Sequence, residues 1–413
     1  MARARRGQGE GSVYFDTSRD RWSAMIELPP DPLTGRRRRR RVTAPTKPAA
    51  LRRLRELQAE VARARDVPTG RALTVQEWMD LWWTREVAPV LKPSTARDYR
   101  LSIDRHIVPT VGRVRLDRLA PSDVRALHRA VMARGASATT AAKVHRCLSR
   151  ALTIAEREGL VPRNVSRLVA SPPSPVTPPQ MLTPQQVRLL LGSLEGTPEH
   201  ARRMTSFMIG ARQGEVLGMM LDPALLHLDD ATPWVELAWE VQRVTWAHGC
   251  GARTPTGWPC GRRRGAECPD RHAPVPRHLE GEQVHGGLWI LRPKTKSSHR
   301  RVALPPPLTA ALRTHIDTYR PERFVFEAAP GVPVDPSRDH AAWVTSLDAA
   351  SLPRVRLHSA RHTAATLLLE AGVPLRTAQE ILGQTQALTT ARYQHPGLDA
   401  QAAALAAVSG TLA

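Results

Sequence analysis

The sequence predicts a multidomain α+β protein: a small sheet with one helix, then a helical domain, then a mainly helical domain with a small β-hairpin or sheet. Three observations lead to this prediction. Strand-like runs precede the first helical pattern, residues 71–170 hold helical patterns with few strand signals, and a proline-rich segment follows at 171–179. A chain of 413 residues also exceeds what one hydrophobic core usually organises.

The first predicted domain covers residues 1–66. Strands are expected at residues 12–15, 22–28 and 40–43, with a turn-rich stretch at 29–35. The following helix should bury the apolar side chains Leu51, Leu54, Leu57 and Val61, which recur at spacings of three and four.

Positive charge gathers in this domain. Residues 1–65 hold 17 Arg and Lys against 7 Asp and Glu, and the whole chain carries a formal charge of +22 with a pI of about 11.3. Such an excess favours a polyanionic partner, with nucleic acid as the first candidate. The run at 36–41 has a second interpretation, a disordered basic tether, because long like-charge runs are usually disordered.

Residues 71–170 should form helices at about 74–83, 93–101, from 121 onward and 137–158. Basic side chains that could contact DNA here are Lys92, Arg97, Arg100, Arg105, Lys143 and Arg146. Composition alone fits a solvated helical bundle equally well. Cys147 lies in an apolar helical pattern and is predicted to be a buried thiol.

A linker is predicted at 171–181, because five prolines among residues 171–179 favour an extended connection. The last domain, 182–413, should open with a helix near residues 182–187 that has Pro184 in its first turn.

Three motifs in the last domain carry chemistry. His358-Ser359-Ala360-Arg361 is followed by Leu382-Gly383-Gln384, and Tyr393 lies nine residues beyond that glutamine. Upstream, Arg212 stands in the segment 209–218 with an acidic residue three places on. This ordered set resembles the tyrosine site-specific recombinases, the phage integrase family, and the resemblance extends over most of the chain.

The resemblance implies the role of each domain. Residues 1–66 would be an arm-type DNA-binding domain, 71–170 a helical, SAM-like core-binding domain, and 182–413 the catalytic domain. Function would be the integration or excision of a mobile element by DNA cleavage and rejoining through a 3′-phosphotyrosyl intermediate. Double-stranded DNA with core-type and arm-type attachment sites would be the partner.

The resemblance also implies residue roles. Tyr393 would be the nucleophile, and Arg212 and Arg361 would hold the phosphate, because guanidinium groups pair well with the charge that develops on its oxygens. His358 would act as general acid or base, or as a hydrogen-bond donor to the phosphate. No cofactor would be required for this chemistry.

Two further positions complete the expected site. The hairpin segment 292–305 would supply Lys294 as the proton donor to the leaving 5′-oxygen, with Lys296 as the less favoured choice. Gln384 departs from the family, which mostly has His or Trp there. Its amide can donate a hydrogen bond but cannot transfer a proton through the reaction.

An insertion at about 246–284 contains a candidate zinc site. Its sulfur ligands would be Cys250, Cys260 and Cys268, with His272 as the fourth ligand and His248 as the alternative. The spacing is irregular, without a Cys-x-x-Cys pair, so a flexible insertion with reduced thiols is the competing interpretation.

Three other functions remain open from the sequence. They are a dimer resolvase of the Xer type, an enzyme like a type IB topoisomerase, and a catalytically silent protein that only occupies specific DNA sites. The basic first domain argues against the first two. The resemblance also implies a homotetramer on DNA, an accessory excision or DNA-bending protein, and a helix at 401–408 that packs on a neighbouring subunit. A frayed C-terminus is the competing interpretation of 401–408. We also expect the protein in the cytosol at the nucleoid, without membrane contact.

Overall fold

The structure is a computed structural model that describes residues 11–28, 38–63, 73–173, 180–251, 254, 257–293 and 299–383. The chain divides into two compact units, Met1–Val176 and Thr177–Ala413. Their boundary falls inside the proline-rich segment. The first unit contains two separate hydrophobic cores, one within residues 24–57 and one within 75–161.

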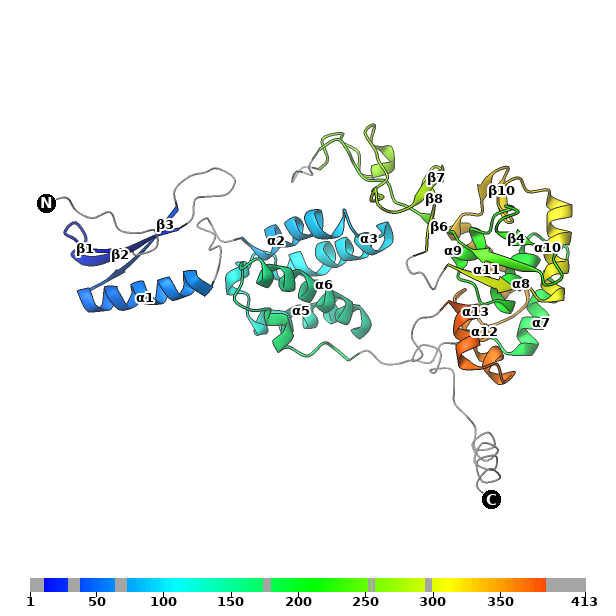
Figure 1. Ribbon diagram of the computed structural model, residues 1–413, viewed down its shortest axis with the longest axis horizontal. Coiled ribbons are helices and arrows are strands. Elements are labelled where there is room, and N and C mark those ends of the chain that lie inside the picture. Colours follow the sequence, from blue (N-terminus) through cyan, green and yellow to red (C-terminus); the bar gives the residue numbers. More distant parts are fainter. Residues whose placement is uncertain are drawn as a thin grey trace, which may run out of the picture. The chain divides into compact units, whose positions relative to one another are not determined.

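The N-terminal core lies between an antiparallel sheet and a helix. The sheet has the order β1 (Ser12–Asp16), β2 (Arg21–Leu28) and β3 (Arg38–Ala44), and α1 (Lys47–Arg63) covers one face of it (Figure 1). All three predicted strands are therefore confirmed. The basic run from Arg38 onward pairs with β2, so the disordered-tether interpretation is wrong for residues 38–41.

Two of the four side chains predicted for the buried face of α1, Leu54 and Leu57, are confirmed there, Leu51 is not, and the Val61 side chain lies outside the described residues. Ala50, Leu54 and Leu57 face the sheet, whereas Leu51 is 37% exposed. Ala50, Leu54 and Leu57 follow one another at spacings of four and three, so they share one helix face, and Leu51 lies to the side of it.

The second core belongs to a helical domain whose helices agree with those predicted. Its elements are α2 (Val75–Trp82), η1 (Trp83–Val87), α3 (Pro93–Ser102), η2 (Ile103–Ile107), α4 (Val108–Val111), η3 (Leu116–Arg118), α5 (Pro121–Ala133), α6 (Ala138–Arg157) and η4 (Val165–Leu168). Thr74 caps α2 through reciprocal hydrogen bonds with Glu77. Cys147 is fully buried, as predicted, and burial raises the pKa of its thiol to about 12.

The second unit combines helices with small sheets. Its helices are α7 (Pro184–Ser193), α8 (Glu199–Met208), α9 (Gln213–Leu217), α10 (Pro306–Tyr319), α11 (Pro336–Ala349), α12 (Ser359–Glu370) and α13 (Leu375–Leu382). Its strands are β4 (Leu226–His227), β5 (Trp234–Leu237), β6 (Glu240–Arg243), β7 (Gly281–His285), β8 (Leu288–Leu291), β9 (Arg300–Ala303), β10 (Glu327–Ala329) and β11 (Val332–Pro333).

Two three-stranded antiparallel sheets stand next to the site described below. Their orders are β4-β5-β9 and β6-β8-β7. β8 and β9 therefore lie in different sheets. Because β9 pairs with β5 and not with β8, the hairpin expected at 292–305 does not form. Residues 294–298, which join them, fall outside the described residues.

The predicted α+β multidomain fold class is confirmed. In the parts of the chain that the structure describes, no helix is both long and apolar enough to cross a membrane.

Candidate active site

Arg212 stands at the first end of the short helix α9. Gly210 precedes it with a φ of +59°, and a Cβ there would lie 2.4 Å from Leu382, so the turn requires glycine. The Arg212 backbone N–H donates to Glu215 Oε2 at 2.9 Å, and its guanidinium Nη1 donates to Glu215 Oε1 at 2.6 Å. These two bonds fix both the helix start and the direction of the side chain.

Glu215 is an almost fully buried carboxylate that holds a second arginine. Arg300, from β9, donates to Glu215 Oε2 at 3.1 Å, and it also donates to the carbonyl of Ile381 at 2.7 Å. Burial alone would raise the pKa of Glu215, but Arg300 and then Arg212 lower it below its ordinary value. Glu215 is therefore a charged anchor for both guanidinium groups.

Arg361 projects from the first turn of α12 and is 4% exposed. Its Nη1 donates to the carbonyl of Gly210 at 2.8 Å, and its Nη2 donates to the carbonyl of Leu382. Arg212 in turn donates to the carbonyl of Gly383 at 3.2 Å. Both arginines are thus bonded to the end of α13, immediately before the segment that carries Gln384 and Tyr393.

The structure brings three of the six predicted catalytic residues together. Arg212, His358 and Arg361 line one pocket of about 320 Å³, beside Gln213 and Glu240. Two guanidinium groups and an imidazole around one hollow provide hydrogen-bond donors for a tetrahedral anion. Lys294, Gln384 and Tyr393 lie outside the described residues, as does Lys296.

His358 is held in its neutral form. Desolvation, followed by the charges of His362, Arg361 and Arg212, lowers the pKa of His358 to about 4. The residue is nevertheless solvent-accessible, so water screens part of these charges. At neutral pH, the ring can accept a proton or donate one hydrogen bond, but it carries no ionised proton to give away.

An NMR titration of the imidazole of His358 should give a pKa well below the usual value of about 6.5. Because the unfolded chain takes up this proton at higher pH than the folded chain, the contribution of His358 to stability is complete above pH 6.5 and declines as the pH falls toward 4. The resonance is identified by its loss in His358→Gln. A pKa at or above 6.5 in the protein without DNA would contradict this electrostatic description.

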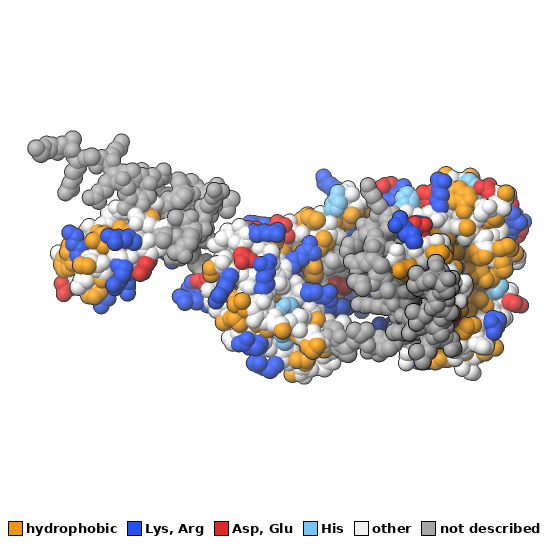
Figure 2. All heavy atoms as spheres, turned by 60° about the horizontal axis from the view of Figure 1, so that its bottom comes forward, with side chains coloured by type: hydrophobic (Ala, Val, Ile, Leu, Met, Phe, Trp, Pro, Cys, Tyr) orange, Lys and Arg blue, Asp and Glu red, His pale blue; other side chains and the backbone are white. Residues whose placement is uncertain are grey.

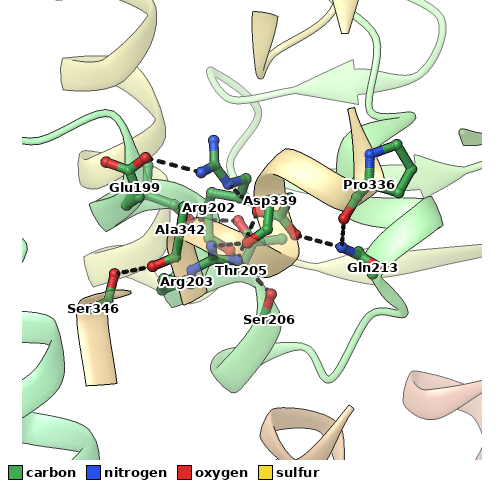
Figure 3. Close-up of polar contacts among 11 residues, drawn as sticks. Glu199, Arg202, Arg203, Thr205, Ser206, Gln213, Pro336, Asp339, Ala342 and Ser346 are labelled. Atoms are coloured by element: carbon green, nitrogen blue, oxygen red, sulfur yellow. Dashed lines mark hydrogen bonds and ion pairs between the residues drawn. The ribbon is translucent and has the colours of Figure 1, made fainter. Parts of the chain in front are cut away.

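A buried cluster of charged side chains holds Gln213, the residue that follows Arg212. Figure 3 shows Asp339 of α11 between two arginines of α8, with Arg202 Nε at 2.8 Å and Arg203 Nη1 at 2.9 Å. Gln213 donates to Asp339 at 2.8 Å and to the carbonyl of Pro336 at 2.8 Å. Burial lowers the pKa of Arg203, and Asp339 opposes this change. The sequence analysis did not identify this cluster.

Asp339→Asn should lower the free energy of unfolding by about 3–5 kcal/mol, because it removes the charge that pairs with buried Arg203 and leaves Arg202 with Glu199 as its acidic partner. Urea denaturation followed by circular dichroism measures this loss. Asp348→Asn is the matched control on the same helix, since Asp348 forms an exposed ion pair with Arg354 and its removal should hardly move the midpoint. Equal losses of unfolding free energy in both variants would contradict this explanation, because Asp339 is buried and Asp348 is exposed.

Basic residues of the helical domain form a second candidate site. Arg105, Lys143 and Arg146 line a pocket of about 440 Å³, which suits a phosphate backbone. Arg100 is less suited, because an ion pair with Asp80 at 2.7 Å offsets its charge. On the face drawn in Figure 2, Lys and Arg side chains are spread over the described surface.

The predicted metal ligands are brought together with one exchange. The three cysteines Cys250, Cys260 and Cys268 meet His248, and the ligand atoms of all four lie within 4.8 Å of one another. His272, the preferred fourth ligand, is not part of this group. The backbone of His272 pairs with Ala247, the neighbour of His248.

Sequence comparisons agree with this description of fold and site. Residues 279–398 match the phage integrase family, and residues 74–132 match the N-terminal SAM-like domain of phage integrases. An integrase of Saccharopolyspora erythraea is 26% identical over 95% of this chain and 94% of its own length.

Solved structures show the same fold. A Tn1549 transposon integrase, solved with a circular intermediate DNA, has a TM-score of 0.62 at 18% identity and covers 82% of this chain and 100% of its own. A lambda integrase tetramer bound to a Holliday junction has a TM-score of 0.55 at 13% identity, over 95% of this chain and 96% of its own. Fold, pocket and family matches together define a DNA strand transferase of the tyrosine recombinase class. Within this chain, residues 279–398 match the phage integrase family.

Proposed function

We propose that this protein integrates and excises a mobile DNA element by site-specific recombination, with Tyr393 as the nucleophile. The placement of Arg212 and Arg361 in one pocket carries the proposal. Both donate to carbonyls at the end of α13, which directly precedes Gln384 in the sequence. The family match at 279–398 includes Tyr393.

The reaction exchanges one phosphodiester bond for another. The phenol oxygen of Tyr393 attacks the scissile phosphorus, a 3′-phosphotyrosyl bond forms, and the 5′-oxygen leaves. Lys294 gives that oxygen its proton, with Lys296 as the alternative donor. The tyrosine proton passes to neutral His358 or to water. A 5′-hydroxyl of the partner strand then attacks the phosphotyrosine and releases the enzyme, and a second round exchanges the other strands.

In this mechanism, side chains of the protein stabilise the negative charge that develops on the phosphate. Arg212 and Arg361 hold the non-bridging oxygens, and Gln384 donates a further hydrogen bond from its amide. We therefore expect no divalent metal to be required for cleavage.

Partners follow from the domains. Residues 1–66 would bind arm-type sites, and 71–170 would bind core-type sites together with the catalytic domain at 182–413. We expect a homotetramer on DNA, supported by the lambda integrase tetramer on a Holliday junction. A helix at 401–408, outside the described residues, would link neighbouring subunits. An accessory excision or DNA-bending protein would determine whether recombination proceeds toward integration or excision.

A covalent trapping assay tests the proposal. DNA fragments that the protein selects from the genomic DNA around its gene are cloned into a supercoiled plasmid, and the reaction is quenched with detergent, with and without host extract. We expect covalent adducts and recombinant products only on selected sites. Specific binding without any adduct, even with extract, would contradict the proposal and indicate a protein that only occupies sites. Relaxation of plasmids without a selected site would indicate a topoisomerase.

A further inference from the structure

The insertion between β6 and β7, residues 244–280, has almost no hydrophobic core. Among its described residues from 245 to 275, Cys268 is the one buried side chain. Regular structure among the described residues there amounts to one helical turn, η5 (Gly265–Glu267), and two isolated bridges, Ala247–His272 and Thr254–Gly257. Apolar packing therefore cannot hold this segment in a defined conformation.

Four ligand side chains meet inside the insertion instead. His248 Nδ1 lies 3.4 Å from Cys260 Sγ and 3.9 Å from Cys250 Sγ. The thiol of Cys250 also interacts with those of Cys260 and Cys268. A tetrahedral zinc ion, with bonds of about 2.0–2.3 Å, separates its ligand atoms by roughly 3.3–3.8 Å. The four ligand atoms lie within 4.8 Å of one another, close enough for one ion to bind all of them after a small adjustment of the side chains.

Neighbouring groups orient these ligands. Backbone N–H groups of Gly249 and Asp270 donate to the sulfur of Cys268 and so fix its position. The His248 ring stacks on Trp258 with 4.2 Å between centroids. Gly249 lets its segment pack closely against the segment that contains Asp270, because a Cβ there would lie 2.2 Å from the Asp270 carbonyl oxygen. Groups that hold ligands in this way raise the affinity of a site for metal.

We propose that His248, Cys250, Cys260 and Cys268 bind one structural Zn²⁺ ion. Four protein ligands fill the tetrahedral shell and leave no position for substrate, so the ion takes no part in strand cleavage. It stabilises the insertion by linking its two ends, as metal does in small domains without a core. This inference goes beyond the proposed function and does not depend on it.

Elemental analysis of the full-length protein tests the site. The protein is purified with a reductant and without chelator, and we expect about one zinc per chain. Cys260→Ser and His248→Ala should lower the zinc content severalfold. His272→Ala should keep it, because that ring is not part of the group. Cys147→Ser is the matched thiol control, since Cys147 lies in the core of the helical domain.

A cobalt titration guards against variants that fail to fold. After removal of metal by a chelator, the reduced wild-type protein should take up about one Co²⁺ and develop the visible absorption of a tetrahedral thiolate complex. The proposal is wrong if the protein contains no zinc and takes up no cobalt. It is also wrong if iron replaces zinc, if a disulfide joins two of the three cysteines, or if Cys147→Ser loses as much zinc as Cys260→Ser.

Discussion

Tyr393→Phe should abolish the covalent protein–DNA adduct and slow strand cleavage by on the order of 10⁴-fold or more, as expected when the nucleophile of a concerted site is removed. The substitution deletes only the phenol oxygen and keeps the ring, so binding to DNA should change little. Cleavage of a radiolabelled core-type site under single-turnover conditions gives the rate, and a mobility shift gives the affinity.

Tyr319→Phe is the control for this experiment. Tyr319 ends α10 and its hydroxyl donates to the carbonyl of Gly196 at 3.1 Å, far in sequence from the site motifs. It should cleave like the wild type. An adduct that persists in Tyr393→Phe but vanishes in Tyr319→Phe would contradict the assignment, because it would identify Tyr319 as the nucleophile.

Arg361→Lys should lower the cleavage rate by about 10²- to 10³-fold, the usual cost of losing a donor to charge that develops in the transition state. Lysine retains the positive charge but cannot reproduce the planar fork of the guanidinium group. The side chain is buried and bonded to the carbonyls of Gly210 and Leu382, so only a correctly placed fork reaches both these carbonyls and the pocket. Single-turnover cleavage at saturating protein measures the effect.

Arg354→Lys is the matched control, because Arg354 is exposed and pairs with Asp348 at 2.7 Å. Its rate should equal that of the wild type. Thermal unfolding of both variants separates a lost catalytic contact from a lost fold. A rate for Arg361→Lys within about threefold of the wild type would contradict the role of this guanidinium in charge stabilisation.

Much of the fold was predictable because its signals are local. Thr74 and Thr183 cap the helices that follow them, and Glu77 and Gln186 complete capping boxes within the same turn. The strands of the N-terminal sheet alternate or carry β-branched and aromatic residues beside clear turns. Face assignment was less exact, since Ala50 instead of Leu51 faces the sheet.

The support of the site was not predictable, because it depends on contacts between distant segments. Arg300 reaches Glu215 across 85 positions, and Asp339 reaches Arg203 across 136. With 60 Lys and Arg in the chain, no local signal separates these from solvent-exposed ones. A buried acidic residue such as Glu215 signals that a partner exists without saying which one.

The metal ligands show the same limit. The three cysteines could be identified because they lie close together in the insertion. Their irregular spacing did not show whether His248 or His272 is the fourth ligand. The folded chain brings His248 within 4.8 Å of the thiols, and His272 is outside this group. Which histidine joins the cysteines depends on how the loop folds, and the sequence pattern does not show that.

Mapping the covalent attachment identifies the nucleophilic residue itself. Wild-type protein is trapped on a selected site that contains a nick, digested with protease and nuclease, and the nucleotide-bearing peptide is sequenced by mass spectrometry. We predict a single 3′-phosphotyrosyl link at Tyr393 and a free 5′-hydroxyl on the other DNA end. Attachment at Tyr14, Tyr99 or Tyr319, a link to a 5′-phosphate, or cleavage without attachment would contradict the account.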